Sequence, residues 1–358
     1  MRLGRRFAGA LLALSAIGVG LVLAGCGSSS STKTLTLGYV TTPTHPYGLA
    51  LTQYAAQVDS ASGGKLKIKL LPVYGGGNDA TLLADEIGGT VNMGSVSAAV
   101  WDTKQVYSFE ALQMPFLITS YALEGKVLGS SLQQQMLAGT ETVGLHGLAI
   151  HEGGLRKPLS TGACFTTAAS FNGVPFRVPP GQLLKDGIAA LGASPTPLPL
   201  SDVYLGLKQG TIKGMEANYG LVLTQKYYEV AKCMTGNVNF WPFPTVLSIN
   251  NKTWNSLTSQ EQGWLTTPAA KLSAESLTIL TNPASKTVPT LCTNGLKIGK
   301  ATPADISGMV AKEASVYKTY EARSPSTTGT FVPQIQQMKA AMPPPAPAAP
   351  LPAGCAAP

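Results

Sequence analysis

Arg177 is the residue whose chemistry is easiest to interpret in this sequence. A planar guanidinium can hold a carboxylate through two parallel, charge-assisted hydrogen bonds. Val178 and Pro179 follow it, and the proline favours an extended backbone, which keeps the direction of the arginine side chain constant. Arg177 is therefore a candidate anion-binding residue. The alternative is a salt bridge at the surface or between domains.

The sequence lacks the common signs of catalysis and metal binding. It contains no GxSxG, HExxH or phosphate-loop motif and no CxxC pair. His45, His146 and His151 lack the spacing of metal ligands, so we expect no metal or other cofactor. The formal net charge of +8 includes no basic block, which argues against a nucleic-acid partner and is compatible with anionic ligands.

The N-terminus is typical of an export signal. Three arginines within the first six residues precede an uncharged run over residues 7–23, which is short for a membrane-spanning helix. The run ends in Leu23-Ala24-Gly25-Cys26, which resembles the bacterial lipobox. We expect a signal peptide over residues 1–25 and a lipidated Cys26 that begins a flexible tether, residues 26–34. The protein would then be exported and lipid-anchored, facing the periplasm or the cell exterior. The alternative is a retained N-terminal membrane anchor.

Periodicity predicts a first α/β unit. Strands are expected at residues 35–40, 65–71 and 91–96, and helices at 47–60 and, capped by Asn78 or Asp79, up to about residue 87. This alternation favours a largely parallel sheet. Such sheets bind ligands at the loops beyond the carboxyl ends of their strands. One candidate face therefore comprises residues 41–45, 75–78 and 95–97.

A second α/β unit follows. The pattern predicts strands at residues 174–178 and 211–218, an extended segment at 195–199, and helices at 182–191 and 203–209, the latter capped by Ser201 or Asp202. Further helical runs are expected around residues 224–234, 259–281 and 303–320. The Pro/Ala-rich segment 340–358 is expected to be a poorly ordered tail.

Six segments resemble, in the same order, the extracytoplasmic solute receptors of tripartite ATP-independent periplasmic (TRAP) transporters, the DctP type. They are residues 63–68 (GGKLKI), 88–94 (GGTVNMG), 110–117 (EALQMPFL), 171–179 (FNGVPFRVP), 191–197 (LGASPTP) and 203–216, from Val203-Tyr204 to Gly214-Met215-Glu216. The resemblance extends over roughly residues 35–265. It implies an organic acid as ligand and a two-part membrane permease as partner.

The resemblance also implies a fold. It is a two-lobe, periplasmic-binding-protein-like α/β fold with hinge strands and a long interlobe helix, which closes on its ligand. We expect lobe 1 at residues 35–155 and lobe 2 at 156–243. Residues 244–339 would return to lobe 1 and supply the long helix and the C-terminal helices, before the tail at 340–358.

Three residues of the predicted site match family motifs. Arg177 takes the principal carboxylate-clamp position, and Arg156 matches a second arginine of many members, although Lys157-Pro158-Leu159 depart from the pattern. For Arg156 a hinge or surface role is the alternative. Glu216 matches the family's acid and is expected to orient an arginine, because a carboxylate would repel a carboxylate ligand. Lys213 stands where the family usually has Asp, which adds local positive charge.

Other candidates for ligand contact follow from their position. Asn218 can donate its amide, Ser95 and Ser97 can donate hydroxyls or simply leave space, and His45 lies in the first strand–helix loop, where a solvated side chain is the alternative. Aromatic residues can wall the pocket or pack in the core: Phe116, Tyr219, Trp241 and Phe243.

The cysteines indicate two disulfides. If Cys26 is lipidated, four cysteines remain in a chain exported to an oxidising compartment, and they allow three connectivities. Sequence alone does not choose among them. The lobes favour pairing Cys164 with Cys233, and Cys292 with Cys355, the second bridge pinning the tail.

Two other classes of function are compatible with parts of the sequence. An ATP-driven (ABC) importer also uses a two-lobed binding lipoprotein, and only the six family segments favour the TRAP type over it. An exported enzyme is the other class, which the missing catalytic motifs disfavour.

Overall fold

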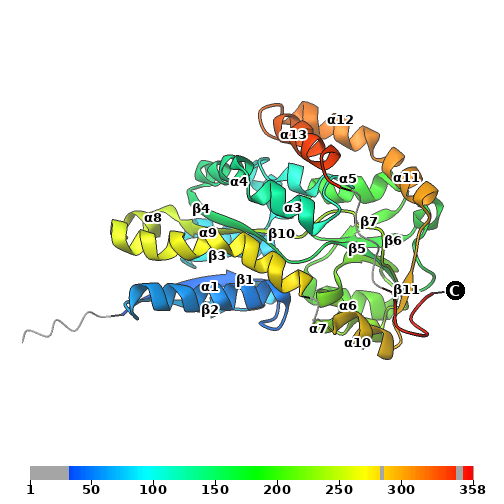
Figure 1. Ribbon diagram of the computed structural model, residues 1–358, viewed down its shortest axis with the longest axis horizontal. Coiled ribbons are helices and arrows are strands. Elements are labelled where there is room, and N and C mark those ends of the chain that lie inside the picture. Colours follow the sequence, from blue (N-terminus) through cyan, green and yellow to red (C-terminus); the bar gives the residue numbers. More distant parts are fainter. Residues whose placement is uncertain (1–31, 283–285, 344–349, 358) are drawn as a thin grey trace, which may run out of the picture. The chain divides into compact units, whose positions relative to one another are not determined.

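The structure is a computed structural model that describes residues 32–282, 286–343 and 350–357. The predicted signal peptide and Cys26 lie outside these residues. The described chain contains two β-sheets with helices packed on them (Figure 1). Within the described residues, no helix combines the length and the apolar character needed to cross a bilayer.

The first sheet has five strands. Their order is β2 (Leu66–Leu71), β1 (Lys33–Tyr39), β3 (Met93–Ser97), β10 (Pro244–Asn250) and β4 (Leu145–Glu152). Strands β1, β2 and β3 are parallel, which confirms the arrangement predicted for them. Strand β10 runs antiparallel to both of its neighbours, so the complete sheet is mixed.

Helices surround this sheet. They are α1 (Pro46–Ser62), α2 (Asp79–Gly88), α3 (Tyr121–Leu128), α4 (Ser131–Leu137), α8 (Asn251–Asn255) and α9 (Ser259–Thr281). The long helix α9 packs along α1 and β4, and Figure 1 shows α1 and α9 side by side. A capping box between Thr258 and Glu261 satisfies backbone groups at its start, and its bounds confirm the prediction.

The second sheet has six strands. Their order is β11 (Lys297–Gly299), β9 (Cys233–Thr235), β5 (Lys157–Ser160), β8 (Gly214–Ala217), β6 (Pro175–Val178) and β7 (Ser194–Pro197). The helices nearest to it in the chain are α5 (Gln182–Ala190), α6 (Leu200–Gln209), α7 (Tyr219–Thr224) and α10 (Thr287–Thr293). The three C-terminal helices are α11 (Pro303–Lys312), α12 (Ala314–Arg323) and α13 (Thr328–Ala340), of which α12 packs on α5 and α13 on α3.

Short 3₁₀ turns connect several of these elements. They are η1 (Tyr74–Gly76), η2 (Ala98–Lys104), η3 (Glu110–Gln113), η4 (Ala138–Val143), η5 (Ala168–Phe171) and η6 (Tyr227–Glu229).

Two short segments cross between the sheets, in addition to the long passage from β10 to β11 that includes α9. One is residues 153–156, between β4 and β5, and the other is residues 240–243, which lead into β10. They pair with each other, since the Arg156 N–H donates to the Trp241 carbonyl (2.8 Å) and the Phe240 N–H to the Arg156 carbonyl (2.9 Å). At Gly154, with φ +126°, a Cβ atom would lie 2.8 Å from the Asn218 side chain. The predicted hinge strands correspond to this crossing, while the predicted lobe boundaries stay a prediction.

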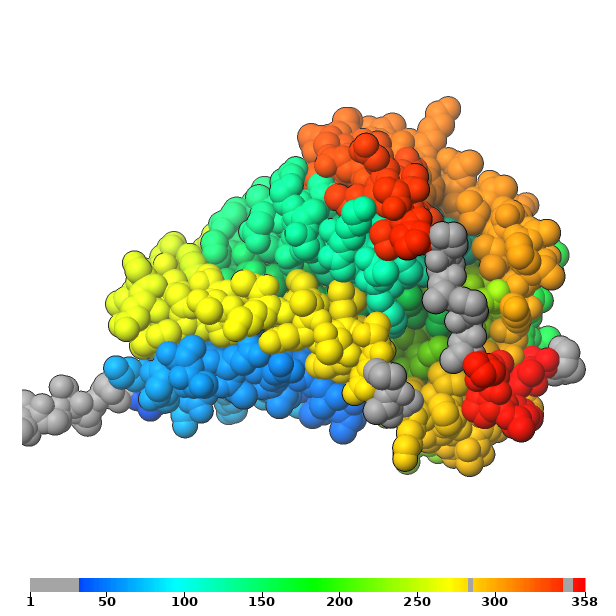
Figure 2. Space-filling model, in the orientation of Figure 1, coloured from blue at the N-terminus to red at the C-terminus, as the bar shows by residue number. Residues whose placement is uncertain are grey.

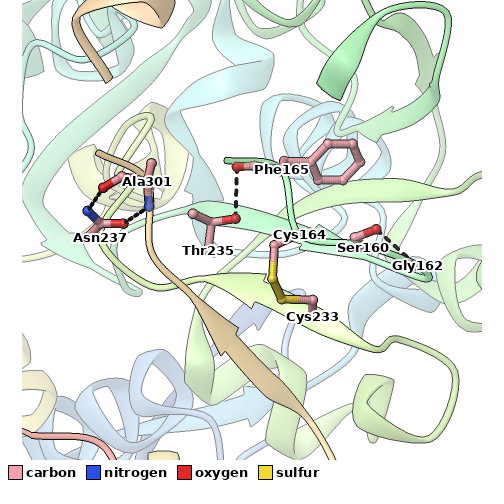
Figure 3. The surroundings of a disulfide bond; sticks show 8 residues. All are labelled: Ser160, Gly162, Cys164, Phe165, Cys233, Thr235, Asn237 and Ala301. Carbon is pink, nitrogen blue, oxygen red and sulfur yellow. Dashed lines mark hydrogen bonds between the residues drawn. A yellow bond between two sulfur atoms is a disulfide. The ribbon is translucent and has the colours of Figure 1, made fainter. Parts of the chain in front are cut away.

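The cysteines pair as the lobes favoured, Cys164 with Cys233 and Cys292 with Cys355. The first bridge joins the segment after β5 to β9, where the Thr235 hydroxyl also donates to the Phe165 carbonyl (2.9 Å; Figure 3). The second bridge holds Cys355, which is buried. Figure 2 shows the last described residues, in red, on the surface beside the gold segment that contains Cys292.

Four predictions about local structure are wrong. The run at residues 224–234 is not one helix, because β9 pairs there with β5 and β11. The run at 303–320 is two helices that break at Glu313. Helix α6 begins at Leu200, so neither Ser201 nor Asp202 caps it. The described end of the tail is held by its disulfide and by the bridge from Ile298 to Ala356, so it is not poorly ordered.

Candidate functional site

A narrow cavity, part of which is open to solvent, lies between loops of the first sheet and elements of the second. The first sheet contributes the loop after β1 and the start of α2, and the second contributes the ends of β6 and β7 and the starts of α6 and α7. The lining residues are Val40, Thr41, Gly77, Asn78, Asp79, Arg156, Arg177, Pro179, Pro180, Pro199, Leu200, Leu221 and Phe243. Both predicted arginines are among them.

Arg156 lies at the crossing before β5 and is 3% exposed. Its Nε donates to one oxygen of Glu216 and its Nη2 to the other (3.2 Å). Its guanidinium also lies 4.4 Å from the centre of the Phe243 ring. Nη1 is buried and has no hydrogen-bond partner among the described residues. This group can therefore accept a new partner without giving up an existing one.

Arg177 lies in β6 and is also 3% exposed. Its Nε and Nη2 both donate to the Leu198 carbonyl, at 3.1 and 2.9 Å, and its Nη1 donates to Glu216 at 3.3 Å. Burial lowers the pKa of Arg177, and the Glu216 carboxylate opposes that effect. The structure thus orients this guanidinium through the backbone of the segment that follows β7.

Glu216, in β8, joins the two arginines and is fully buried. Its position follows from the sheet, because β8 pairs with β5 on one side and with β6 on the other. The two guanidinium groups are thereby held together although they carry like charges. Glu216 itself does not line the cavity, and its orienting role stays a prediction.

Two polar residues of the first lobe face this pair across the cavity. Asp79, the first residue of α2, is 8% exposed, and its Oδ1 accepts the Ser97 N–H at 2.8 Å. Burial raises the pKa of Asp79 to about 6, while the Ser97 N–H and both arginines act in the opposite direction. The Thr41 hydroxyl is buried and has no partner among the described residues.

Direct contacts hold the two sides of the cavity together. The Leu200 N–H donates to the Gly77 carbonyl at 3.3 Å, and a Cβ atom at Gly77, where φ is +80°, would lie only 3.0 Å from the Leu200 side chain. His45 Nε2 lies 3.3 Å from the Asn218 side-chain oxygen. The structure is therefore a closed arrangement of the two lobes.

The remaining polar candidates do not line the cavity. The Asn218 side chain accepts the Leu221 N–H (2.7 Å) and donates to the Gly153 carbonyl (3.0 Å), so it caps α7 and fastens the crossing. His45 is buried and not solvated, and burial lowers its pKa to about 3. Ser97 caps the following 3₁₀ turn, and the Ser95 hydroxyl contacts His151 at 2.8 Å.

Among the aromatic candidates only Phe243 lines the cavity. Phe116 packs edge-on against Phe240, 5.6 Å between ring centres, and Trp241 is buried beside the same ring. Tyr219 lies 5.6 Å from the Lys157 ammonium group. Phe116 and Trp241 therefore pack in the core, which was the alternative to a place in the pocket wall.

The sequence reasoning missed Asp79 as a residue of the cavity. It identified Asp79 only as a possible cap of α2, whereas Asn78 provides that cap by accepting the Ala80 and Thr81 N–H groups. The available signal was the candidate face, which included residues 41–45 and 75–78 and stopped one residue short. In the part of the chain that the structure describes, no group of three or more His, Cys, Asp or Glu side chains could hold a metal ion.

Comparison with known proteins places these features in a family. The family described as "Bacterial extracellular solute-binding protein, family 7" (DctP) matches residues 37–323. The 2,3-diketo-L-gulonate-binding periplasmic protein YiaO of Escherichia coli K12 is 27% identical over 235 residues, 66% of this chain and 71% of that protein. The C4-dicarboxylate-binding periplasmic protein DctP of Rhodobacter capsulatus is 26% identical over 256 residues, 71% of this chain and 75% of that protein.

A solved structure shows the same fold. The sugar acid binding protein DctPAm of Advenella mimigardefordensis, in complex with galactonate, superposes with a TM-score of 0.79 at 23% identity. The match covers 86% of this chain and 98% of that one. The two-lobe fold predicted from sequence is thereby confirmed. The family match includes most of the described chain and both cavity arginines, and the chain belongs to the DctP family of bacterial extracellular solute-binding proteins, the TRAP type.

Proposed function

We propose that the chain is an extracytoplasmic receptor that captures a small organic acid and delivers it to the membrane permease of a TRAP transporter. The observation that carries the proposal is the buried Nη1 group of Arg156, a residue that lines the cavity; this group has no partner among the described residues. A buried donor without an acceptor costs about 1–3 kcal/mol. A ligand carboxylate at Nη1 removes that cost.

The relatives support this class of ligand. The Escherichia coli relative is named for 2,3-diketo-L-gulonate, the Rhodobacter relative for C4-dicarboxylates, and the Advenella structure contains galactonate. All of these compounds carry a carboxylate. A carboxylate is also the group for which paired guanidinium donors are best suited.

The two arginines take different parts in holding the acid. Arg156 offers Nη1 directly. Arg177 offers its Nη1, whose 3.3 Å contact with Glu216 is long for a charge-assisted hydrogen bond and can be exchanged for a ligand oxygen. The Leu198 carbonyl holds the rest of the Arg177 guanidinium in place during this exchange. The site is therefore oriented before the acid arrives.

Capture follows from closure of the two lobes. Because the lining residues come from both sheets, an acid in the cavity contacts both lobes only when they are closed, and its differential contacts stabilise that form. Opening breaks the Leu200–Gly77 and His45–Asn218 contacts. Closure also removes the acid from water, which strengthens its pairing with the arginines. The permease would recognise the closed form.

Calorimetric titration with a library of organic acids, selected first by thermal shift, tests the proposal. We expect at least one acid to raise the melting temperature and to bind the protein. Arg156→Lys and Arg177→Lys should each lower the affinity about ten- to a hundredfold, because an ammonium group cannot reproduce the planar donor geometry. The bound acid should be recovered unchanged after long incubation, since a receptor does no chemistry on its ligand.

Arg323→Lys is the matched control. Arg323, in α12, pairs with Glu110 and does not line the cavity, so the same substitution there should leave the affinity unchanged. Circular dichroism of each variant reports whether it is folded. A folded protein that binds none of the acids, or whose affinity is the same in all three variants, would refute the proposal.

The attachment to the membrane is part of the proposal. A lipid on Cys26 and a tether from Cys26 to the start of β1 would keep the receptor near its permease. The predicted tether, residues 26–34, is too long at its end, because Lys33 and Thr34 pair with β2. Cys26→Ser should move the exported protein from the membrane fraction to the soluble fraction. Unchanged membrane association of this variant would contradict the lipid anchor and leave the ligand proposal intact.

A further inference from the structure

The polar groups that line the cavity specify more than one carboxylate. Three lining residues keep hydrogen-bonding capacity: Arg156 Nη1 and the Thr41 hydroxyl are buried without a partner among the described residues, and the Asp79 carboxylate accepts the Ser97 N–H at Oδ1, which leaves Oδ2 for a ligand. Arg156 can only donate and ionised Asp79 can only accept, while Thr41 can do either. A ligand that satisfies all three must present an acceptor to the arginine and a donor to the aspartate.

The charges around the cavity limit how many carboxylates the ligand can carry. Asp79, Arg156 and Arg177 are the ionisable residues of the described lining, and Glu216 lies directly behind the arginines. With Asp79 ionised, the two positive and two negative charges balance. One ligand carboxylate adds a single negative charge, which the arginines contact. A second ligand carboxylate adds a further negative charge, which has no cationic partner and lies beside the Asp79 carboxylate. Two neighbouring negative charges repel strongly in a buried site.

The position of Asp79 also favours a specific contact. Asp79 is the first residue of α2, and its Oδ1 accepts the Ser97 N–H at 2.8 Å. These two features fix the orientation of the carboxylate. It lies on the lobe opposite to the arginines. A ligand whose carboxylate is on the arginines would therefore turn its other end, or its middle carbons, towards Asp79 and Thr41. Hydroxyl groups on those carbons supply the donor that Asp79 needs.

We infer that Asp79 accepts a hydrogen bond from a ligand hydroxyl and makes the site select hydroxylated monocarboxylates over dicarboxylates of equal chain length. The inference rests on the proposed function and adds to it the chemical class of the acid. Thr41 contributes a second hydroxyl contact from the same lobe. Asp79 is thus the residue that determines specificity, while the arginines bind the group that all small carboxylates share.

Calorimetric titration with six-carbon acids tests this inference. The probes are the aldonates D-gluconate and D-mannonate, the dicarboxylate adipate, and hexanoate, which has neither hydroxyls nor a second carboxylate. We expect the better aldonate to bind the wild type at least about tenfold more tightly than adipate or hexanoate, because a hydrogen bond to a charged group is worth that much. Asp79→Asn should weaken the aldonate about tenfold or more and strengthen adipate, since it removes the charge and keeps the shape.

Two further variants make the result specific. Asp85→Asn is the matched control, because Asp85 lies on the same helix, contacts Tyr74 and does not line the cavity; it should behave as the wild type. Thr41→Val should weaken the aldonate and leave adipate unchanged. It also provides a test that does not depend on whether Asp79→Asn folds.

The outcomes separate this inference from the proposed function. If adipate or hexanoate binds the wild type as tightly as both aldonates, or if neither Asp79→Asn nor Thr41→Val changes the ratio, Asp79 does not select hydroxylated acids, although the chain still binds acids. If the folded protein binds none of these acids and none of the wider library, the proposed function itself is refuted, and this inference with it.

Discussion

Replacement of Glu216 by Gln should break the hydrogen bonds that orient the two arginines and destabilise the fold. In the native structure Glu216 Oε1 accepts from Arg156 Nη2 (3.2 Å) and Arg177 Nη1 (3.3 Å), and Oε2 accepts from Arg156 Nε. A Gln has the same shape but one oxygen and one amide nitrogen. In either orientation of the amide, its NH₂ group faces at least one arginine N–H, so a donor opposes a donor.

The magnitude follows from burial. The side chains of Arg156, Glu216 and Arg177 are 4%, 0% and 4% exposed, so solvent screens these charges poorly. Each ion pair is worth about 4 kcal/mol of attraction at an effective dielectric constant of about 20. Removing one member of a buried ion pair costs about 3–5 kcal/mol net. We expect the free energy of unfolding to fall by about that amount and the melting temperature by on the order of 5 °C or more.

The ligand should reverse part of this loss. Without Glu216 the two guanidinium groups lack their shared counter-charge, so an anionic ligand that binds both recovers some of the lost attraction. Differential scanning calorimetry with and without a saturating acid measures the effect. The ligand-induced rise of the melting temperature should be larger in Glu216→Gln than in the wild type.

The control for this prediction is Glu229→Gln. Glu229 is exposed in the second lobe and accepts a hydrogen bond from Tyr204 at 2.7 Å, so the same substitution there should change the melting temperature little. If Glu216→Gln melts at the wild-type temperature, the three groups are not a coupled buried cluster. If it is destabilised but its ligand-induced rise equals that of the wild type, the acid does not contact the arginines.

Three further predictions concern stability. Burial raises the pKa of Asp79 to about 6, above its unfolded value, so the native state loses stability as the pH rises through about 6. The free energy of unfolding of Asp79→Asn should therefore exceed that of the wild type by up to about 3 kcal/mol at pH 8 and differ little from it at pH 4. Calorimetry at both pH values measures this difference. Burial raises the pKa of Glu313, whose oxygens have no partner among the described residues, to about 9, so the native state loses stability as the pH rises from the unfolded pKa through about 9. Glu313→Gln should therefore match the wild type at about pH 4 and exceed its melting temperature at pH 7 and still more at about pH 9; equal melting curves at all three pH values would contradict the burial. Replacing Cys292 and Cys355 together by Ser opens a loop with a sequence separation of 63 and should cost about 4 kcal/mol while the acid affinity stays the same; a lost affinity would show that the bridge supports the cavity.

The elements that sequence predicted well carry their own local signals. Helix α9 has a capping box at its start and matches the prediction at both ends. The Asn78 cap and the end of α1 at Gly63 likewise depend on residues within a few positions of one another. Local propensity suffices for such elements because tertiary packing agrees with it.

The strands that sequence missed lack such signals. Every residue of β10 is buried, and β4 is buried over most of its length, so neither shows the alternation of a half-exposed strand. The short strand β9 lies in a segment predicted to be helical, and its pairing with β5 and β11 decides its conformation. These strands exist because distant segments offer them hydrogen-bonding partners, which no short window of sequence contains.

The amino-acid sequence by itself determined the family, the two-lobe fold and the two arginines, because each of these depends on residue types and on motifs that can be read along the chain. Only the tertiary structure decided that Asp79 and Thr41 face those arginines, and that Asn218 and His45 hold the lobes together. The physical reason is separation. Asp79 and Arg177 are about 100 residues apart in the chain and come from α2 and β6, and they line one cavity only in the folded protein.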